Sequence, residues 1–378
     1  MKIATVKGIE IELHLSTLVI VGLVGFYAAQ LFYATTGILD IFSLIIVGLI
    51  NGFFILFSII AHELLHSIVS LRHGLNVSKI ELYLFGGVSN IEEEPKTPRS
   101  ETIISAAGPA ASLLIGITLL AAYYIPTLLL GITLPPILGI TLWYSGISNT
   151  GLGFFNLIPA FPMDGGRVLR AYLWKRRDNL LSATETASKV GYYFGWTMVG
   201  FGFIEIIFLP GLIGGFWFII LGFFLSNSSR SAYQQTVYEY KLSKISAGEI
   251  SKKAAEKIPF DIKIKDAVQN YFMKYRKSYF PVEKNGKIIG LVSIDDIKEI
   301  PPNQRADLII GKAMKEISEY PNVQNEETAK KAFTKIQKEE EEPKIIVVQK
   351  NGDVSGFITK DEISSAIRLS DLLFGEKV

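Results

Sequence analysis

Two histidines and a glutamate stand in a pattern that could carry metal chemistry. His62, Glu63 and His66 belong to the sequence His-Glu-Leu-Leu-His within a long apolar stretch. Residues four apart share one face of a helix, so both imidazoles could bind one zinc ion while Glu63 reaches a metal-bound water. Zinc lowers the pKa of such a water to about 7, and an adjacent carboxylate can accept its proton during attack on a carbonyl. The pattern therefore predicts, in outline, peptide hydrolysis.

The surroundings of the pattern decide between chemistry and chance. Five residues can match by accident in a soluble chain. Here they lie within a predicted membrane span, where ionisable groups cost several kcal/mol and are functional by default. The apolar setting therefore favours a metal site.

A catalytic zinc usually has three protein ligands and one open position, so a third ligand is needed. His14 and His73 lie near the ends of the predicted spans and are poorly placed. Asp164 is a better candidate, because Pro159 and Pro162 break the preceding helix, and non-helical backbone at membrane depth must be covered by protein or line a cavity. The alternative for Asp164 is an ordinary Asp-Gly turn at the membrane surface.

The composition divides the chain into two unlike halves and excludes some classes of protein. Of 378 residues 49% are hydrophobic, yet the apolar runs stop near Ser226 and the remainder is rich in Lys and Glu. The net charge of +2 is too close to zero to argue for a nucleic-acid-binding protein. Because the chain has no cysteine, a disulfide framework and a thiolate metal site are both excluded.

Six stretches approach the roughly 20 apolar residues that a membrane span requires. The start of the chain has no small-residue cleavage site, so we expect an uncleaved first span. The last two stretches are separated only by a turn at Pro210-Gly211. The six are Leu13–Ala34, Ile41–Leu71, Thr102–Ile125, Ile137–Leu157, Val190–Leu209 and Gly211–Leu225.

The distribution of basic residues predicts the orientation. The loops after the first and third spans contain no Lys or Arg, whereas the loop after the fourth is rich in them: Arg167, Arg170, Lys175, Arg176 and Arg177. Basic loops stay in the cytoplasm. We therefore expect a multi-pass protein of the cell membrane with both termini cytoplasmic.

The spacing of two motifs resembles the site-2 protease family of intramembrane metalloproteases. These are His62-Glu63-x-x-His66 and, about a hundred residues later, the run Asn156 to Gly165, which reads N-x-x-P-x-x-P-x-D-G. The resemblance covers roughly Ile41 to Arg170. It implies one zinc per chain held by His62, His66 and Asp164, Glu63 as general base, and membrane proteins as substrates. Asn156 matches the family residue thought to stabilise the oxyanion; the alternative is an asparagine that caps the helix end.

Two further stretches fit the same resemblance. Lys79–Phe85 alternates with the period of a strand and ends at Gly86-Gly87, where the family has a membrane-associated β-hairpin. A free edge there could pair with an extended substrate through Tyr83, Phe85, Gly86 and Gly87; the alternative is a plain surface hairpin. Gly108–Ser112 resembles the family motif G-P-x-x-N with Ser112 in place of Asn, and its small residues could serve helix packing alone.

The soluble half repeats itself at a constant offset of 66 residues. Lys284–Ile297 aligns without gaps on Lys350–Ile363, and each copy begins with an Asn-Gly hairpin signal. An acidic turn then opens a helix. Each copy is therefore predicted to be strand, turn, strand and helix.

A duplicated unit of this kind resembles a CBS-domain pair. In that family a hydroxyl residue and an Asp three positions later commonly meet the ribose of an adenine nucleotide. Ser293 and Asp296 fit this pattern, whereas Thr359 is followed by Glu362. The resemblance implies ATP, ADP or AMP as a ligand; the alternative is a module that joins two copies of the chain and binds no nucleotide.

The predicted fold class is a polytopic α-helical membrane protein with a short membrane-associated β-hairpin, joined to a cytoplasmic α/β CBS-domain pair. The expected parts are residues 1–230, a linker at 231–246, and 247–378 with repeats at about 247–305 and 306–370. Two other functions stay open: a CBS-regulated transporter or channel, and a zinc-binding relative that does not cleave. A transport path does not call for H-E-x-x-H with a distant Asp-Gly, so protease is the preferred prediction.

Overall fold

The computed structural model describes residues 1–83, 86–91, 95–208, 214–339 and 344–374. Two compact units divide the chain, Met1–Tyr233 and Gln234–Val378. The predicted turn at Pro210-Gly211 lies outside the described residues, as does Phe85.

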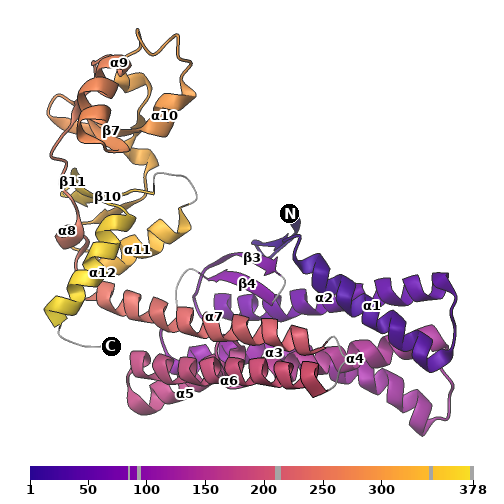
Figure 1. Ribbon diagram of the computed structural model, residues 1–378. Coiled ribbons are helices and arrows are strands. Elements are labelled where there is room, and N and C mark those ends of the chain that lie inside the picture. The colour runs from indigo at the N-terminus through magenta and orange to yellow at the C-terminus, as the bar shows by residue number, and fades with distance from the viewer. Residues whose placement is uncertain (84–85, 92–94, 209–213, 340–343, 375–378) are drawn as a thin grey trace. The chain divides into compact units, whose positions relative to one another are not determined.

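Unit 1 is built of long helices and one small sheet (Figure 1). A π-helix, Ile125–Leu129, continues α3. The helices are α1 Thr17–Thr36, α2 Ile41–Arg72, α3 Pro98–Tyr124, α4 Pro136–Asn156, α5 Asp164–Arg177, α6 Leu180–Phe208 and the first part of α7 Gly214–Ser243.

Within the described ranges, four segments are long and apolar enough to cross a membrane: Thr17–Thr36, Ile41–Arg72, Pro98–Leu129 and Leu180–Phe208. They correspond to the first, second, third and fifth predicted spans. The first begins four residues later than predicted, because Ile9–Leu13 forms a strand. Helices α4 and α7 cover the two remaining predicted spans, and α5 is a helix that the sequence reading treated as loop.

Glycines allow the helices of unit 1 to approach closely. A methyl group on Gly116 of α3 would lie 2.4 Å from Thr150 Oγ1 of α4. On α6, a methyl group at Gly195 would lie 2.6 Å from the carbonyl oxygen of Gly222 on α7. Small residues at helix interfaces are the usual basis of tight packing in membranes, where lipid offers no hydrophobic drive for association.

A four-stranded sheet packs against α2 and has the order β1-β2-β3-β4. Its strands are β1 Lys2–Val6, β2 Ile9–Leu13, β3 Val77–Tyr83 and β4 Gly86–Ile91. Strand β2 runs parallel to β3, with Glu10 opposite Lys79, and β4 runs antiparallel to β3, with Leu82 opposite Gly87. Ile9, Ile80 and Leu82 are buried together against apolar side chains of α2 such as Leu56. The sheet is thereby fixed to the helix that bears the two histidines.

Unit 2 contains two small sheets, with strand orders β5-β6-β7-β8 and β11-β10-β9. Short π and 3-10 turns occur at Val268–Met273, Ile310–Lys312 and Ile317–Glu319. After the end of α7, the elements are α8 Ala247–Ile250, β5 Ile258–Pro259, α9 Ile264–Ala267, β6 Tyr279–Lys284, β7 Lys287–Ser293, α10 Ile294–Glu299, β8 Lys315–Glu316, β9 Asn322–Gln324, α11 Ala329–Lys338, β10 Ile346–Lys350, β11 Asp353–Ile358 and α12 Lys360–Phe374.

The sequence repeat is a structural repeat. The hairpin β6–β7 places Lys284 opposite Lys287, and β10–β11 places Lys350 opposite Asp353, both shifted by 66 residues. Asn285 and Asn351 both have positive φ, 52° and 53°, and the following glycines do as well. Two successive residues with positive φ are what the tightest hairpin turns require, which explains the Asn-Gly pair in each copy. Leu291 of one copy packs with Phe357 of the other in a shared core.

Candidate metal centre

His62 and His66 lie one turn apart on the buried face of α2. Asp40 caps the N-terminus of this long apolar helix, because its carboxylate accepts a hydrogen bond from Ser43 N. Only 5% of His62 and 7% of His66 is exposed. Their Nε2 atoms lie 3.2 Å apart. Helical spacing alone therefore brings two potential ligands to one point.

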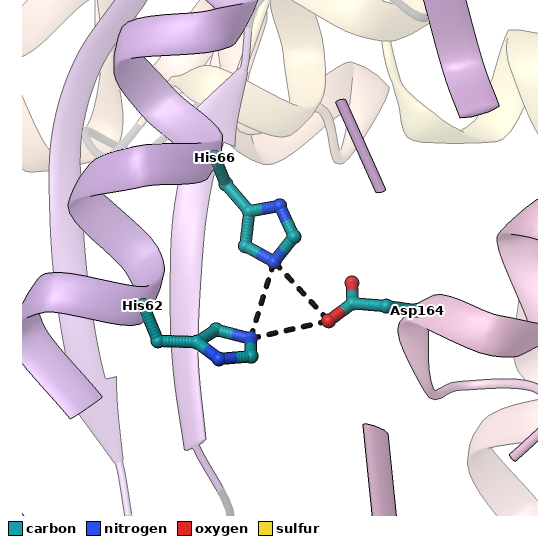
Figure 2. Close-up of side chains that lie close together, drawn as sticks. All are labelled: His62, His66 and Asp164. Carbon is teal, nitrogen blue, oxygen red and sulfur yellow. Dashed lines mark hydrogen bonds and ion pairs between the residues drawn. The ribbon is translucent and has the colours of Figure 1, made fainter. Parts of the chain in front are cut away.

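Asp164 reaches the same point from the other side (Figure 2). It is the first residue of α5, and its Oδ2 lies 3.1 Å from both Nε2 atoms. The chain folds back sharply here: a methyl group on Gly165 would lie 2.2 Å from Leu157 O, and one on Gly166 would lie 2.4 Å from Phe161 N. The two glycines after Asp164 therefore permit a turn that a side chain would prevent.

Contacts on the far side of each ring fix which nitrogen faces the centre. His66 Nδ1 lies 2.7 Å from Ile104 O, and a carbonyl oxygen can only accept, so Nδ1 carries the proton and Nε2 presents a lone pair. His62 Nδ1 lies 2.9 Å from Ser112 Oγ. Outer contacts of this kind are the usual way in which metal-binding histidines are oriented.

The three donor atoms fit a tetrahedral metal. Zinc bonds of about 2.0–2.1 Å place neighbouring tetrahedral ligands about 3.3 Å apart. The observed separations are 3.1, 3.1 and 3.2 Å, close to that value. A carboxylate oxygen and imidazole lone pairs repel one another unless a proton or a metal ion lies between them. Among the described residues, His62, His66 and Asp164 are the group that could hold a metal ion.

Gly108 of α3 leaves the space that an ion would need. A methyl group on Gly108 would lie 2.2 Å from His66 Nε2 and 2.5 Å from His62 Nε2. These nitrogens are the metal-facing atoms, so any side chain at this position would displace them. The sequence reading assigned Gly108 to helix packing, whereas the structure places it at the centre.

Glu63 lies beside the edge strand of the sheet. It is half-buried and stands next to His62 on α2. A methyl group on Gly87 of β4 would lie 2.3 Å from Glu63 Cγ and 2.9 Å from Glu63 Oε1. The candidate base and the backbone of β4 are therefore in direct contact.

The free edge of the sheet differs from the one that was predicted. Strand β3 was expected to offer an open edge, but β2 pairs with it on one side and β4 on the other. The pairing of β2 with β3 ends at Leu82, and Tyr83, whose hydroxyl donates to Glu81 and whose ring lies 5.1 Å from that of His14, stays a predicted substrate contact. The outer strand next to Glu63 is β4, which contains Gly86 and Gly87. The N-terminal strands cause the difference, because β2 occupies the side of β3 that would otherwise be open.

Asn156 is the last residue of α4, and its side-chain amide donates to Leu152 O over 3.0 Å. The height of Asn156 along the helix bundle can be located from a hydrogen bond between α4 and α2, in which Ser145 Oγ donates to Asn51 Oδ1. Helix α3 runs antiparallel to both α2 and α4, so α2 and α4 are parallel. Eleven residues, about 16 Å, separate Asn51 from His62 and Ser145 from Asn156. Asn156 therefore lies at the level of His62.

The other two candidate histidines take no part in the centre. His14 Nδ1 lies 2.8 Å from Ser16 Oγ at the start of α1. His73 Nδ1 bonds to Val69 O at the end of α2. Neither belongs to the group of side chains that could hold a metal.

In unit 2, both pairs of residues predicted to bind ribose lie at the N-terminus of a helix. Ser293 Oγ donates to Asp296 Oδ2 over 2.6 Å, and the N–H of Asp296 returns a bond to Ser293 Oγ. Thr359 and Glu362 make the same side-chain pair. The reciprocal cap at Ser293 satisfies free N–H groups at the helix start, and at Thr359 the N–H of Asp361 donates to Thr359 Oγ1. In the first pair, Asp296 Oδ2 serves the cap, and Asp296 Oδ1 lies 3.9 Å from Lys315 Nζ.

Tyr279 is a neighbour of the second pair that the sequence did not indicate. Burial, and then the charges of Glu362 and Asp361, raise the pKa of Tyr279 to about 12. Its ring packs against Phe357, with centroids 6.4 Å apart. An aromatic side chain of the first repeat therefore stands beside Thr359–Glu362 of the second.

Two sequence profiles of known families match the chain. The profile described as peptidase family M50 matches residues 52–138 and 131–198, which include His62, His66 and Asp164. The profile described as the CBS domain matches residues 247–302.

The chain also resembles complete curated proteins. It is 30% identical over 372 residues to a zinc metalloprotease of Methanocaldococcus jannaschii, a match that covers 97% of this chain and 96% of that protein. It is 30% identical over 323 residues to the protein Rip3 of Mycobacterium tuberculosis, covering 85% of this chain and 81% of that one. Among solved structures, the site-2 protease from Methanocaldococcus jannaschii is 28% identical, covering 62% of this chain and 94% of that chain with a TM-score of 0.42.

Proposed function

The chain belongs to peptidase family M50, and from this premise we propose how its own residues cleave a substrate within the membrane. It is an intramembrane zinc metalloprotease with a CBS domain, which sets aside the transporter and channel alternative. The observation that carries the proposal is the convergence of His62 Nε2, His66 Nε2 and Asp164 Oδ2 within 3.2 Å of one another.

The three side chains would hold one zinc ion. When bound, zinc supplies Lewis acidity, which lowers the pKa of water to about 7 and polarises a carbonyl. The outer contacts of the rings with Ser112 and Ile104 keep both Nε2 atoms directed at the ion. Gly108 keeps the space open.

Glu63 is the general base in this proposal. It follows His62 directly on α2, so its carboxylate stands one step round the helix from the ligands. It would accept the proton of the attacking water and later deliver it to the leaving amine. The contact with Gly87 holds it next to β4.

Strand β4 would receive the substrate. A protease needs extended backbone, and an edge strand can bind it by adding a strand to the sheet. The edge position of β4 and its contact with Glu63 both support this role. The scissile peptide would then lie between the sheet and the three ligands.

Asn156 would stabilise the developing oxyanion with its side-chain N–H. Its depth, level with His62, supports the role, and its bond to Leu152 O uses one of the two amide hydrogens. The other hydrogen is available to a substrate oxygen.

A cleavage assay tests the proposed function. Purified full-length protein in lipid vesicles is incubated with a panel of single-span membrane proteins, with and without a zinc chelator. We expect cuts within or next to the spans, loss of cutting on chelation, and recovery when Zn²⁺ is returned. A protein that binds zinc stoichiometrically yet cuts no member of the panel would instead be a holdase-like relative.

Proline substitutions test strand addition at β4. Successive residues of a strand direct their N–H groups to opposite sides, so of Val88→Pro and Ser89→Pro one removes a bond to β3 and the other removes a donor from the open edge. We expect the open-edge variant to lower kcat/KM about tenfold, the value of one lost hydrogen bond, with zinc content unchanged. If both variants retain full cleavage with normal folding, β4 does not pair with substrate.

We further propose the membrane arrangement. Six spans, formed by α1, α2, α3, α4, α6 and the first part of α7, would place both termini in the cytoplasm, with the boundary near residue 230 and a linker at 231–246. The even number of spans and the basic segment Arg167–Arg177 of α5 support this orientation. Arg170 adds less positive charge to the cytoplasmic surface than its position in the sequence suggests, because its side chain is buried.

The soluble half would be a CBS-domain pair that binds adenine nucleotide and alters proteolysis. The structural repeat supports the pair, and the Ser293–Asp296 cap places a hydroxyl and a carboxylate together, where ribose would compete with Lys315 for Asp296 Oδ1. Helix α7 would transmit the effect, because it belongs to both compact units without interruption. Any coupling must be reciprocal: a nucleotide that changes substrate affinity has its own affinity changed by substrate.

Titration of the full-length protein in lipid with ATP, ADP and AMP tests this part. We expect one nucleotide per chain, bound at the Asp296 site, and about tenfold weaker binding in Asp296→Asn because one charge-assisted hydrogen bond is lost. Asn keeps an oxygen that can maintain the helix cap, and Glu362→Gln is the matched change in the second copy. Absence of heat at millimolar nucleotide would leave the module as a docking element or a dimerisation surface.

A further inference from the structure

The loop that carries Asp164 is held at Phe161 by side chains from other helices. Phe161 is almost completely buried, and its carbonyl oxygen accepts a hydrogen bond of 2.5 Å from Ser229 Oγ on α7. Ser229 is 0% exposed. Because residues 157–163 lie between α4 and α5 and have no helical ladder, such contacts determine where the loop lies.

Helix α6 packs against the hydrogen bond between Ser229 and Phe161. A methyl group on Gly191 would lie 2.2 Å from Phe161 O and 2.3 Å from Ser229 Oγ. The bare glycine therefore lets the hydroxyl and the carbonyl meet. No other residue type would fit between them.

The ring of Phe161 is held by an ion pair that leads back to the histidines. The Arg170 guanidinium lies 5.4 Å from the centre of the ring, and Arg170 Nε donates to Glu101 Oε1 over 2.6 Å. Glu101 lies on α3, less than one turn before Ile104, whose carbonyl orients His66. Phe161 thus links α7 and α6 to the helix that supports the ligands.

Small movements of this loop would matter at the centre. Asp164 lies only three residues after Phe161, and metal–ligand distances tolerate shifts of about 0.2 Å. Loss of a partner one contact removed from a metal typically costs 10–100-fold in metal affinity.

We propose that Ser229 is a positioning residue for the zinc ligand Asp164, acting through its hydrogen bond to the carbonyl of Phe161. The inference rests on the proposed function in one respect, the assignment of Asp164 as a ligand. It adds that a residue on the last helix of unit 1, outside both sequence motifs, sets the affinity of the metal site.

The test compares two buried serines of α7 in the full-length protein in lipid. Ser229→Ala removes the bond to Phe161 O. Ser226→Ala, one turn earlier, removes the bond from Ser226 Oγ to Tyr192 O on α6, a bond in which no residue of the loop takes part. Each variant loses one buried hydroxyl that bonds to a backbone carbonyl. Zn²⁺ affinity is measured by chelator competition, and the unfolding temperature and kcat/KM are measured alongside.

We expect about tenfold weaker Zn²⁺ binding in Ser229→Ala and unchanged binding in Ser226→Ala, at similar losses of thermal stability. Equal Zn²⁺ affinities in the two variants would overturn the proposal. If Ser229→Ala does not fold, Ser229→Gly removes the hydroxyl without adding volume, and wild-type Zn²⁺ affinity in that variant would overturn it equally. Asp164→Ala separates the two levels: unweakened Zn²⁺ binding there contradicts the ligand assignment itself, whatever Ser229 does.

Discussion

Replacement of Glu63 by Gln is expected to lower kcat/KM for a membrane-spanning substrate by about 10²–10⁴-fold and to leave one zinc per chain. Gln keeps the shape and hydrogen-bonding capacity of Glu but cannot accept the proton of the attacking water. The side chain contacts Gly87 through Cγ and Cδ, atoms that Gln retains, so the packing against β4 should survive. Cleavage of a single-span protein in vesicles and zinc content by elemental analysis measure the two halves of the prediction.

The matched control is Glu81→Gln, on the neighbouring strand β3. Glu81 is also a partly buried glutamate of the sheet, paired with Lys79 over 2.8 Å and bonded to Tyr83. It does not follow a ligand, so we expect its loss to change cleavage less than threefold, about the effect of an exposed ion pair. Cleavage within tenfold of the wild type in Glu63→Gln would assign the base to another group.

The donor set could be predicted because its members obey short rules. His62 and His66 are one helical turn apart, so any helix brings them together. Asp164 needed a long-range contact, yet the broken helix before it and the resemblance to a known family pointed to it. The three donor atoms do converge, whereas His14 and His73 lie elsewhere.

The parts that were missed depend on contacts between elements remote in sequence. The role of Gly108 requires the register of α3 against α2, which periodicity does not give. The hydrogen bond between Ser112 and His62 depends on the same register of α3 against α2. The alternation of Ile9, Ile11 and Leu13 with Glu10 and Glu12 is typical of a strand. That this strand pairs with β3 and covers one of its edges depends again on a contact between elements remote in sequence.

The soluble half was easier to predict because the same strand and turn signals occur in both copies of the repeat. An Asn-Gly pair at the same place in both copies fixes two hairpins, and the constant offset fixes their equivalence. The repeat does not predict the packing between copies, where the ring of Tyr279 of the first contacts that of Phe357 of the second.

Replacement of Gly108 by Ala is expected to weaken zinc binding by about 100-fold or more, as much as Asp164→Ala, although every ligand is retained. The added methyl group would lie 2.2 Å from His66 Nε2, far inside contact distance. The His66 ring cannot rotate away freely, because the hydrogen bond of its Nδ1 to Ile104 O fixes the opposite edge of the ring. Since ligand orientation alone accounts for 10–100-fold in metal affinity, displacing both nitrogens should exceed that range.

Two other glycines in the same bundle provide controls for Gly108→Ala. Gly116→Ala, on the same helix, would press on Thr150 Oγ1 at 2.4 Å and should lower the unfolding temperature without affecting zinc. Gly151→Ala on α4 has open space around it and should change neither quantity. Chelator competition and thermal unfolding distinguish the three variants. Stoichiometric zinc at wild-type affinity in Gly108→Ala would mean that the metal does not lie on the α3 side of the histidine pair, and the ligand geometry would have to be redrawn around another face of α2.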